Sequence, residues 1–188
     1  MEERNSEIPK QNNKFLSKAA ISFGVWFLVL LTAWYFLYEV VIKPNDFYDK
    51  HVIATIASQG QWFLEFLGYS TLLFDYSGNG FSDFVQIQGS PGVIIGAGCD
   101  GLVIIALFII FISLFAGPVR HKLWFIPLGI LLIHSLNVLR VAILAIIVLY
   151  RPEWLAFNHD YTFVLITYGF VFLLWMIWVN KFSQTVAK

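Results

Sequence analysis

The only cysteine of the chain, Cys99, stands among glycines just before an apolar stretch that begins at Leu102. A thiol at the N-terminus of a helix has its thiolate form stabilised, and a stabilised thiolate is a usable nucleophile. Gly98 and Gly101 permit close approach of a substrate backbone, and amides in such a segment can donate to an oxyanion. The pattern therefore indicates nucleophilic catalysis. Two alternatives remain open, an intermolecular link and a small packing residue, because unpaired cysteines are often buried.

Asp100 follows the cysteine directly, and its charge opposes a neighbouring thiolate. A carboxylate in this position also suits the positive end of a helix dipole. We therefore expect Asp100 to cap the following helix, with its side chain turned away from the thiol.

Arg140 is the second chemically informative residue, because it lies inside a long run of uncharged and mostly aliphatic residues. A guanidinium facing lipid costs several kcal/mol, so the side chain is expected to face the protein interior. There it would be a fixed cation beside a reacting group. The alternative is a structural arginine that extends to the membrane surface or binds a lipid headgroup.

His159 precedes the last apolar stretch and could serve first as general base and then as general acid. Its alternative role is an interfacial histidine with one edge in water. The turn at residues 117–122 is expected on the cytoplasmic side. Counting helical rise outward from this turn puts Cys99 and Arg140 each roughly 27 Å above it, and a count from the end of the last span puts His159 at a similar outer level. No metal site is expected, because the histidines and the cysteine lack a recognisable ligand spacing, and no cofactor is expected either.

The composition shows what kind of protein must position these residues. Of 188 residues, 59% are hydrophobic, 18% aromatic and only 13% charged, which indicates an integral membrane protein of one domain. The formal net charge is zero and there is no basic block, so nucleic acid is excluded as a partner.

Long apolar runs separated by polar segments predict an all-α integral membrane protein built on a four-helix transmembrane bundle. Lys and Arg gather on one side of these spans, which predicts that both termini are cytoplasmic. The expected segments are a cytoplasmic tail at 1–18, a first span at 19–41, an extracytoplasmic segment at 42–98, a second span at 99–116, a cytoplasmic loop at 117–122, a third span at 123–150, an extracytoplasmic loop at 151–160, a fourth span at 161–179 and a cytoplasmic tail at 180–188.

The third predicted span is unusually long. The third span would be about 42 Å long as one helix, which exceeds a hydrocarbon core of roughly 30 Å, so it must tilt, break or project outside the membrane.

Within the extracytoplasmic segment, apolar residues from Val52 to Phe74 recur at helical spacing and predict an amphipathic helical segment at the membrane surface. A marginal fifth span is disfavoured by the polar residues at its centre. A short β-hairpin is expected around Gly89-Ser90-Pro91-Gly92, just before the second span.

Three short blocks give the chain a resemblance to a known family. Gly98-Cys99-Asp100-Gly101-Leu102 enters one span, Asn137-Val138-Leu139-Arg140-Val141 lies inside the next, and Asn158-His159-Asp160 opens the last. In order and in predicted side, these blocks resemble the signature blocks of the exosortase/archaeosortase family, and the small size resembles its short bacterial branch, exosortase F. Larger exosortases have additional N-terminal spans that this chain lacks, which leaves the route of substrate entry open.

The resemblance implies a membrane-embedded cysteine transpeptidase or protease that cuts C-terminal sorting signals from exported proteins and transfers these proteins to a cell-surface acceptor. By matching positions, it implies Cys99 as the acyl-accepting nucleophile, Arg140 as the stabiliser of the thiolate or oxyanion, and His159 as the acid and base. Gly98, Asp100, Gly101, Asn137 and Asn158 are the expected supporting or oxyanion residues.

The resemblance also implies a location and partners. The chain would be a multi-pass protein of the bacterial cytoplasmic membrane, with its active site on the extracytoplasmic face. Its partners would be membrane lipid and exported proteins that carry a motif, a transmembrane helix and a basic tail, with a small accessory membrane protein as a further candidate. Two other functions remain open from sequence: a non-catalytic membrane assembly or substrate-binding subunit, and an enzyme that transfers a lipid or acyl group through Cys99.

Overall fold

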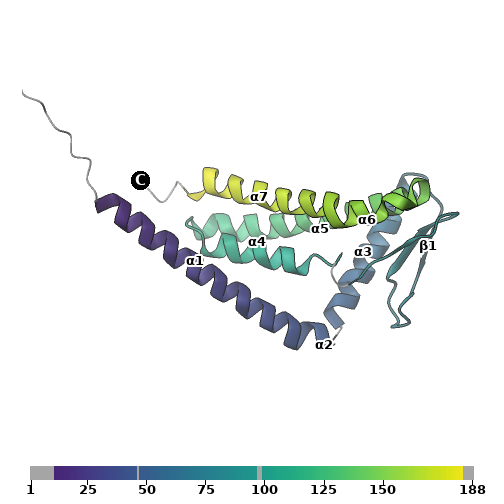
Figure 1. The fold of residues 1–188 in the computed structure, drawn as a ribbon, viewed down its shortest axis with the longest axis horizontal. Helices are drawn as coiled ribbons and strands as arrows, with labels where there is room; N and C mark the ends of the chain where they lie inside the picture. Colours follow the sequence, from purple (N-terminus) through teal and green to yellow (C-terminus); the bar gives the residue numbers. More distant parts are fainter. Residues whose placement is uncertain (1–10, 46, 97–98, 184–188) are drawn as a thin grey trace, which may run out of the picture.

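The computed structural model describes residues 11–45, 47–96 and 99–183, and it is mostly helical (Figure 1). Gly98, one of the predicted supporting residues, lies outside the described residues. The elements in chain order are α1 (Gln11–Leu37), the π-helical turn η1 (Tyr38–Ile42), α2 (Lys43–Asn45), α3 (Phe47–Phe66), β1 (Thr71–Phe74), β2 (Phe84–Ile87), β3 (Val93–Ile94), α4 (Leu102–Leu114), α5 (Val119–Tyr150), the 3-10 turn η3 (Pro152–Trp154), α6 (Leu155–Phe157), the π-helical turn η4 (Asn158–Thr162) and α7 (Phe163–Lys181).

Three helical stretches in the described residues are long and apolar enough to cross a membrane: Ala20–Ile42, Val119–Tyr150 and Pro152–Lys181. The remaining expected span, the second at 99–116, corresponds to α4, which is apolar but only 13 residues long. At a rise of about 1.5 Å per residue it extends roughly 20 Å, less than the hydrocarbon core. The four-span bundle with both termini inside therefore remains a prediction.

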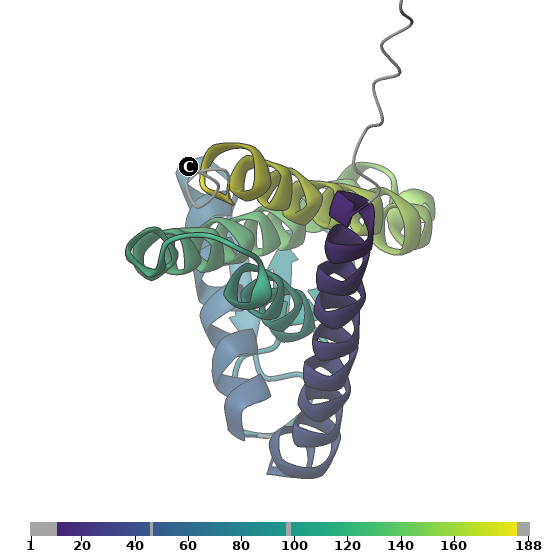
Figure 2. The same cartoon turned by 90° about the vertical axis from the view of Figure 1, so that its left-hand side faces the viewer.

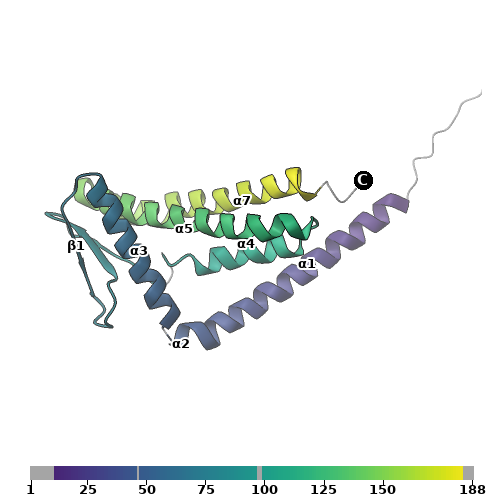
Figure 3. The same cartoon turned by 180° about the vertical axis from the view of Figure 1, so that it is seen from behind.

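Helices α4, α5 and α7 lie side by side and form a bundle (Figures 1 and 3). Their contact is a buried apolar cluster that includes Phe108, Phe125 and Trp178. The packing is close at Gly129, where a Cβ would come within 2.2 Å of the Phe108 ring. A small residue at this point therefore lets α4 approach α5.

Helix α1 approaches the bundle from one side only (Figure 2). Phe23 and Phe27 meet Phe111 edge to face, with ring centroids 5.6 and 6.2 Å apart. The rest of the apolar surface of α1 is exposed, and none of its most apolar window is buried within the protein. Such a surface is compatible with lipid as its solvent.

A second apolar core lies beyond the bundle, where α3 and the sheet pack on the outer half of α5 (Figure 1). Helix α5 contributes Phe125 and Ile133 to the bundle core, and Val141 and Val148 to the outer core. Its 32 residues span about 48 Å as one helix. The helix is continuous, so it does not break, while tilt and projection out of the membrane remain predictions.

Helix α3 ends earlier than the sequence predicts. The amphipathic pattern is correct, since Ile53, Ile56 and Leu64 are buried on one face, but the helix stops at Phe66 and not at Phe74. Gly68 adopts a positive φ of 91°, its N–H donates to Glu65, and the N–H of the next residue donates to Leu64. These two bonds form a Schellman motif, which terminates a helix at a glycine.

The predicted hairpin is confirmed, but it is part of a three-stranded antiparallel sheet in the order β1-β2-β3. Strands β2 and β3 pair across the glycine-rich turn, with Val85 opposite Val93. The additional strand is β1, which occupies residues expected to be helical. Its alternating burial places Leu73 on the core side of the sheet and Phe74 on the exposed side.

Residues 152–162, most of which were expected in a loop, are helical and run directly into α7. Pro152 starts this stretch, where its missing N–H is tolerated because the first turn of a helix has no internal acceptor for it. The π-helical turn η4 then carries Asn158, His159 and Asp160 on a helix rather than on a flexible connection.

Candidate active site

Cys99 and His159 meet where the sheet reaches the bundle. The Cys99 Sγ lies 3.5 Å from the His159 Nε2, across 60 residues of sequence. Cys99 sits between β3 and α4, and its own N–H donates to the carbonyl of Gly96 at 2.8 Å. The 3.5 Å between the Cys99 Sγ and the His159 Nε2 is within reach of a sulfur to nitrogen hydrogen bond, so the pair has the geometry of a nucleophile beside its base.

The other nitrogen of the same imidazole is also engaged. The His159 Nδ1 lies 2.7 Å from the Oδ1 of Asp160. Side chains at successive positions of an α-helix do not face each other, but these two lie in the π-helical turn η4. Within the described residues, Cys99 thus contacts His159, and His159 contacts Asp160. Sequence analysis did not single out Asp160 as a functional residue, although it stands in one of the family blocks.

Arg140 lies on α5 and lines a cavity of about 290 Å³ together with His159 and Asp160. Its side chain is half-buried, and its Nε is buried without a hydrogen-bond partner among the described residues. A buried donor without a partner is uncommon and requires an explanation. The predicted inward orientation is compatible with this geometry, since Arg140 lines a cavity beside the histidine and its Nε is buried.

Asn137 holds the backbone at the cysteine. It is buried one turn before Arg140 on α5, and its Nδ2 donates to the Cys99 carbonyl. Gly101 has a positive φ of 79°, and a Cβ there would lie 3.5 Å from the same Nδ2. The glycine is therefore needed for the left-handed backbone, whereas a Cβ would make only ordinary van der Waals contact with the Asn137 amide.

Asp100 turns into the protein and not toward solvent. It is 3% exposed, and its Oδ1 accepts from the N–H of Leu102 at 2.9 Å, so it caps the start of α4 as expected. Its other carboxylate oxygen is buried without a donor. Burial raises the pKa of Asp100 to about 6, opposed by the Leu102 amide and assisted by the charge of Asp49.

Asp49 is a second residue that sequence analysis missed. It is 2% exposed near the start of α3, its Oδ2 accepts from the Tyr38 hydroxyl at 3.1 Å, and its Oδ1 has no donor. Its charge acts on Asp100 and helps to raise the pKa of that residue. No sequence signal pointed to Asp49, since 50 residues lie between it and Asp100.

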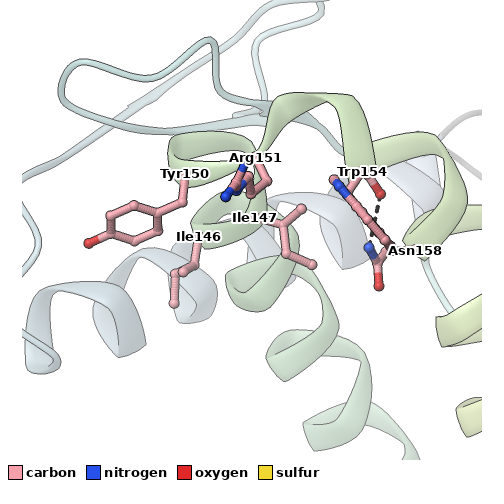
Figure 4. A pocket seen from close by; sticks show the side chains of 6 residues that line it. All are labelled: Ile146, Ile147, Tyr150, Arg151, Trp154 and Asn158. Carbon is pink, nitrogen blue, oxygen red and sulfur yellow. Dashed lines mark hydrogen bonds between the residues drawn. The ribbon is translucent and has the colours of Figure 1, made fainter.

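Asn158 does not join the cysteine. Its Nδ2 donates to the carbonyl of Trp154 at 2.9 Å, one turn back on the same helix. Figure 4 shows it beside a different cavity, of about 600 Å³, which Tyr150, Arg151 and Trp154 also line. The geometry therefore gives Asn158 a local role in η4. No group of three or more His, Cys, Asp or Glu residues within the described ranges could hold a metal ion.

Comparison with known proteins identifies the family. The family model described as transmembrane exosortase matches residues 14–180, which is most of the chain and includes every element from α1 to α7. This chain belongs to the transmembrane exosortase family. A member of this family with three long apolar helices is a multi-pass membrane protein.

A curated exosortase relative matches over a shorter range. Archaeosortase A of Haloferax volcanii is 30% identical over 135 residues, which cover 70% of this chain and 43% of the relative. The chain thus spans less than half the length of the curated relative that it matches. No solved structure matches the chain.

Proposed function

We propose that this exosortase is a membrane-embedded cysteine transpeptidase. It would cleave the C-terminal sorting signal of exported proteins and transfer them to a cell-surface acceptor through a thioester on Cys99. The observation that carries the proposal is the 3.5 Å approach of the Cys99 Sγ to the His159 Nε2, in a chain whose family is named for this activity.

In the first step His159 takes the thiol proton, and the sulfur attacks the scissile carbonyl carbon. The carbonyl oxygen becomes an oxyanion as the carbon becomes tetrahedral. Collapse of this intermediate breaks the C–N bond, and His159 returns its proton to the leaving amine. The exported protein is then held as a thioester while its membrane helix and basic tail depart.

In the second step an acceptor amine or hydroxyl attacks the thioester and loses its proton to His159, which regenerates the thiol. If water attacks instead, the same site acts as a protease. Asp160 supports both steps by fixing the ring orientation of His159 and stabilising its protonated form, so it is a positioning residue.

Arg140 is the group best suited to the oxyanion. Preorganised donors that become satisfied only when the negative charge develops lower the barrier most. The unpartnered Nε of Arg140 meets that description, whereas the Cys99 N–H is already bonded to Gly96 and the Asn137 amide to the Cys99 carbonyl. We therefore assign oxyanion stabilisation to Arg140, and positioning of the cysteine to Asn137, Gly101 and Asp100.

The proposed topology follows the distribution of charge. Four spans, with both termini and the 117–122 loop in the cytoplasm, would place residues 42–99 and the Cys99 to His159 contact on the outer face of the bacterial cytoplasmic membrane. Exported proteins reach that face after translocation, and membrane lipid would surround the α1 surface. A small accessory membrane protein would be an optional partner in this arrangement.

The test is the accumulation of uncleaved substrate in cells. With Cys99→Ala, an exported protein bearing a sorting signal should retain its C-terminal helix, while the variant stays in the membrane at normal level. The unmodified chain should form a hydroxylamine-sensitive adduct whose mass equals the truncated substrate. Normal processing by Cys99→Ala would make the chain a non-catalytic subunit, and a fatty-acyl adduct would indicate lipid or acyl transfer.

A further inference from the structure

The outer edge of β3 is unpaired in the described residues, because β3 is the last strand of the sheet. Ile94 lies opposite Phe84, and the N–H of Ile95 donates to the carbonyl of Asp83 at 2.8 Å. In an antiparallel ladder the residues that bond to the neighbour alternate with those that do not. The N–H and C=O of Ile94 therefore point away from β2, toward the open edge.

A cavity of about 620 Å³ lies beside this edge. The sheet contributes Phe84 and Ile94 to its lining, and the helical stretch opposite contributes Leu155, Ala156 and His159. The cavity is of the size that small ligands and peptide side chains occupy in proteins. His159 and Asp160 also line the Arg140 cavity, so the cavity at the sheet edge and the proposed oxyanion site share these two side chains.

The cavity beside the edge strand also reaches the catalytic pair. His159 lines this cavity together with Ile94, and its Nε2 lies 3.5 Å from the Cys99 Sγ. A ligand paired with Ile94 would extend along the edge at about 3.3 Å per residue. A peptide that fills the cavity therefore contacts the imidazole that lies against the Cys99 Sγ.

We propose that the open edge of β3 binds substrate by strand addition. On the basis of the function proposed above, the extended segment of an exported protein just before its transmembrane helix pairs with the backbone of Ile94. It fills the cavity between the sheet and α6, and presents its scissile carbonyl to Cys99. Backbone pairing supplies affinity independent of sequence, while the apolar surface of Phe84 and Ile94 selects the side chains.

Cross-linking tests the position of the substrate. A photoreactive amino acid is placed at Ile94 in a Cys99→Ala chain, and an epitope-tagged exported protein that the unmodified chain cleaves is the probe. The matched control is Leu72, which is exposed by 44% against 48% for Ile94 but lies on the opposite edge strand. We expect a cross-link at Ile94 at least about tenfold stronger, mapped by mass spectrometry to the segment before the probe's transmembrane helix.

Equal cross-linking from the two positions, or a cross-link elsewhere in the probe, would overturn strand addition. The proposed function is judged separately, by whether Cys99→Ala alone blocks cleavage of the same probe. Blocked cleavage without an Ile94 cross-link rejects the binding mode and keeps the transpeptidase.

Proline substitution tests the backbone contact itself. Ile94→Pro removes an N–H that β2 does not use, and edge strands accept proline at such positions. The matched control is Thr71→Pro on β1, whose N–H also points away from β2 but at the opposite edge. We expect Ile94→Pro to slow cleavage by about tenfold or more, and by more than Ile94→Ala, with Thr71→Pro unchanged. An unchanged rate of maleimide labelling at Cys99 checks that the site stays folded. Equal cleavage rates for all three variants, with the labelling rate unchanged, would reject the backbone contact.

Discussion

Asp160 holds the imidazole of the residue before it, with its Oδ1 2.7 Å from the His159 Nδ1. The two side chains are 61% and 43% exposed, so the pair contributes little to folding stability. Its effect is on the tautomer and orientation of the ring, which leaves Nε2 to face the Cys99 Sγ.

Asp160→Ala is accordingly expected to lower the rate of substrate cleavage by about 10- to 100-fold, since general acid and base catalysis depends on ring orientation. Thermal stability in detergent should not change. Glu153→Gln, a neutralised carboxylate on the same outer stretch, is the control and should cleave normally. A cleavage rate for Asp160→Ala equal to that of the control would remove Asp160 from the mechanism.

For Arg140, the expected result of substitution by methionine is a loss of about 10²- to 10³-fold in the first-order rate of acylation, with substrate binding little changed. Arg140→Lys should recover part of this rate, because it restores the charge without the planar guanidinium. Arg120→Lys, at an exposed position, is the control. The measurement is thioester formation at saturating substrate, and a change confined to substrate affinity would contradict the oxyanion assignment.

Gly101→Ala should displace the cysteine. A side chain at a φ of 79° costs about 1–2 kcal/mol, because this left-handed backbone conformation is strained for any residue with a Cβ. We expect a lower midpoint of thermal unfolding and an altered rate of Cys99 alkylation. Gly24→Ala, where a Cβ meets nothing within 4 Å, is the control. Unchanged alkylation in Gly101→Ala would show that the left-handed turn at Gly101 does not position Cys99.

The acidic pair predicts a dependence of stability on pH. Because burial raises the pKa of Asp100 to about 6 from its usual 3.8, the folded protein binds the proton more tightly than the unfolded chain. The stability that this group contributes is full below about pH 4 and is lost as pH rises to about 6. Tryptophan fluorescence during thermal unfolding in detergent measures it.

Asp49→Asn is the variant that isolates this effect. The amide keeps the shape and can donate to Asp100, while the charge of Asp49 is removed. We expect the loss of stability between pH 4 and 6 to become smaller. Asp75→Asn, on the exposed 75–80 turn, is the control. An undiminished loss in Asp49→Asn would mean that the two carboxyl groups are not coupled.

The sequence predicted which side chains come together better than it predicted the outer fold. Cys99, Arg140 and His159 could be singled out because each is chemically unusual where it stands, and helical rise alone placed them at one level. Asp49 and Asp160 could not be found in this way. The Asp49 contact with Asp100 depends on how α3 returns to the bundle, and that of Asp160 depends on a π-helical turn that no residue pattern announces.

The sheet shows where periodicity misleads. Thr71 to Phe74 continue the apolar character of α3, so a helical pattern extends over them, yet Gly68 ends the helix and β1 pairs with β2. The glycine was a readable stop signal, but the pairing of β1 is decided by tertiary contacts. The length of α5 was predictable from its apolar run, whereas the 13 residues of α4 are too few for length alone to count it as a span.

Helix α5 contributes side chains to both apolar cores, and it therefore couples the site to the bundle as a single body. Val141 and Ile133 lie on the same rod, one in each core, with Asn137 and Arg140 between them. Under the proposed topology, a thicker or thinner bilayer would therefore raise or lower the whole site relative to the lipid surface. In the proposed reaction, the spacing between a substrate's cleavage point and its membrane helix would then be a length measured against α5.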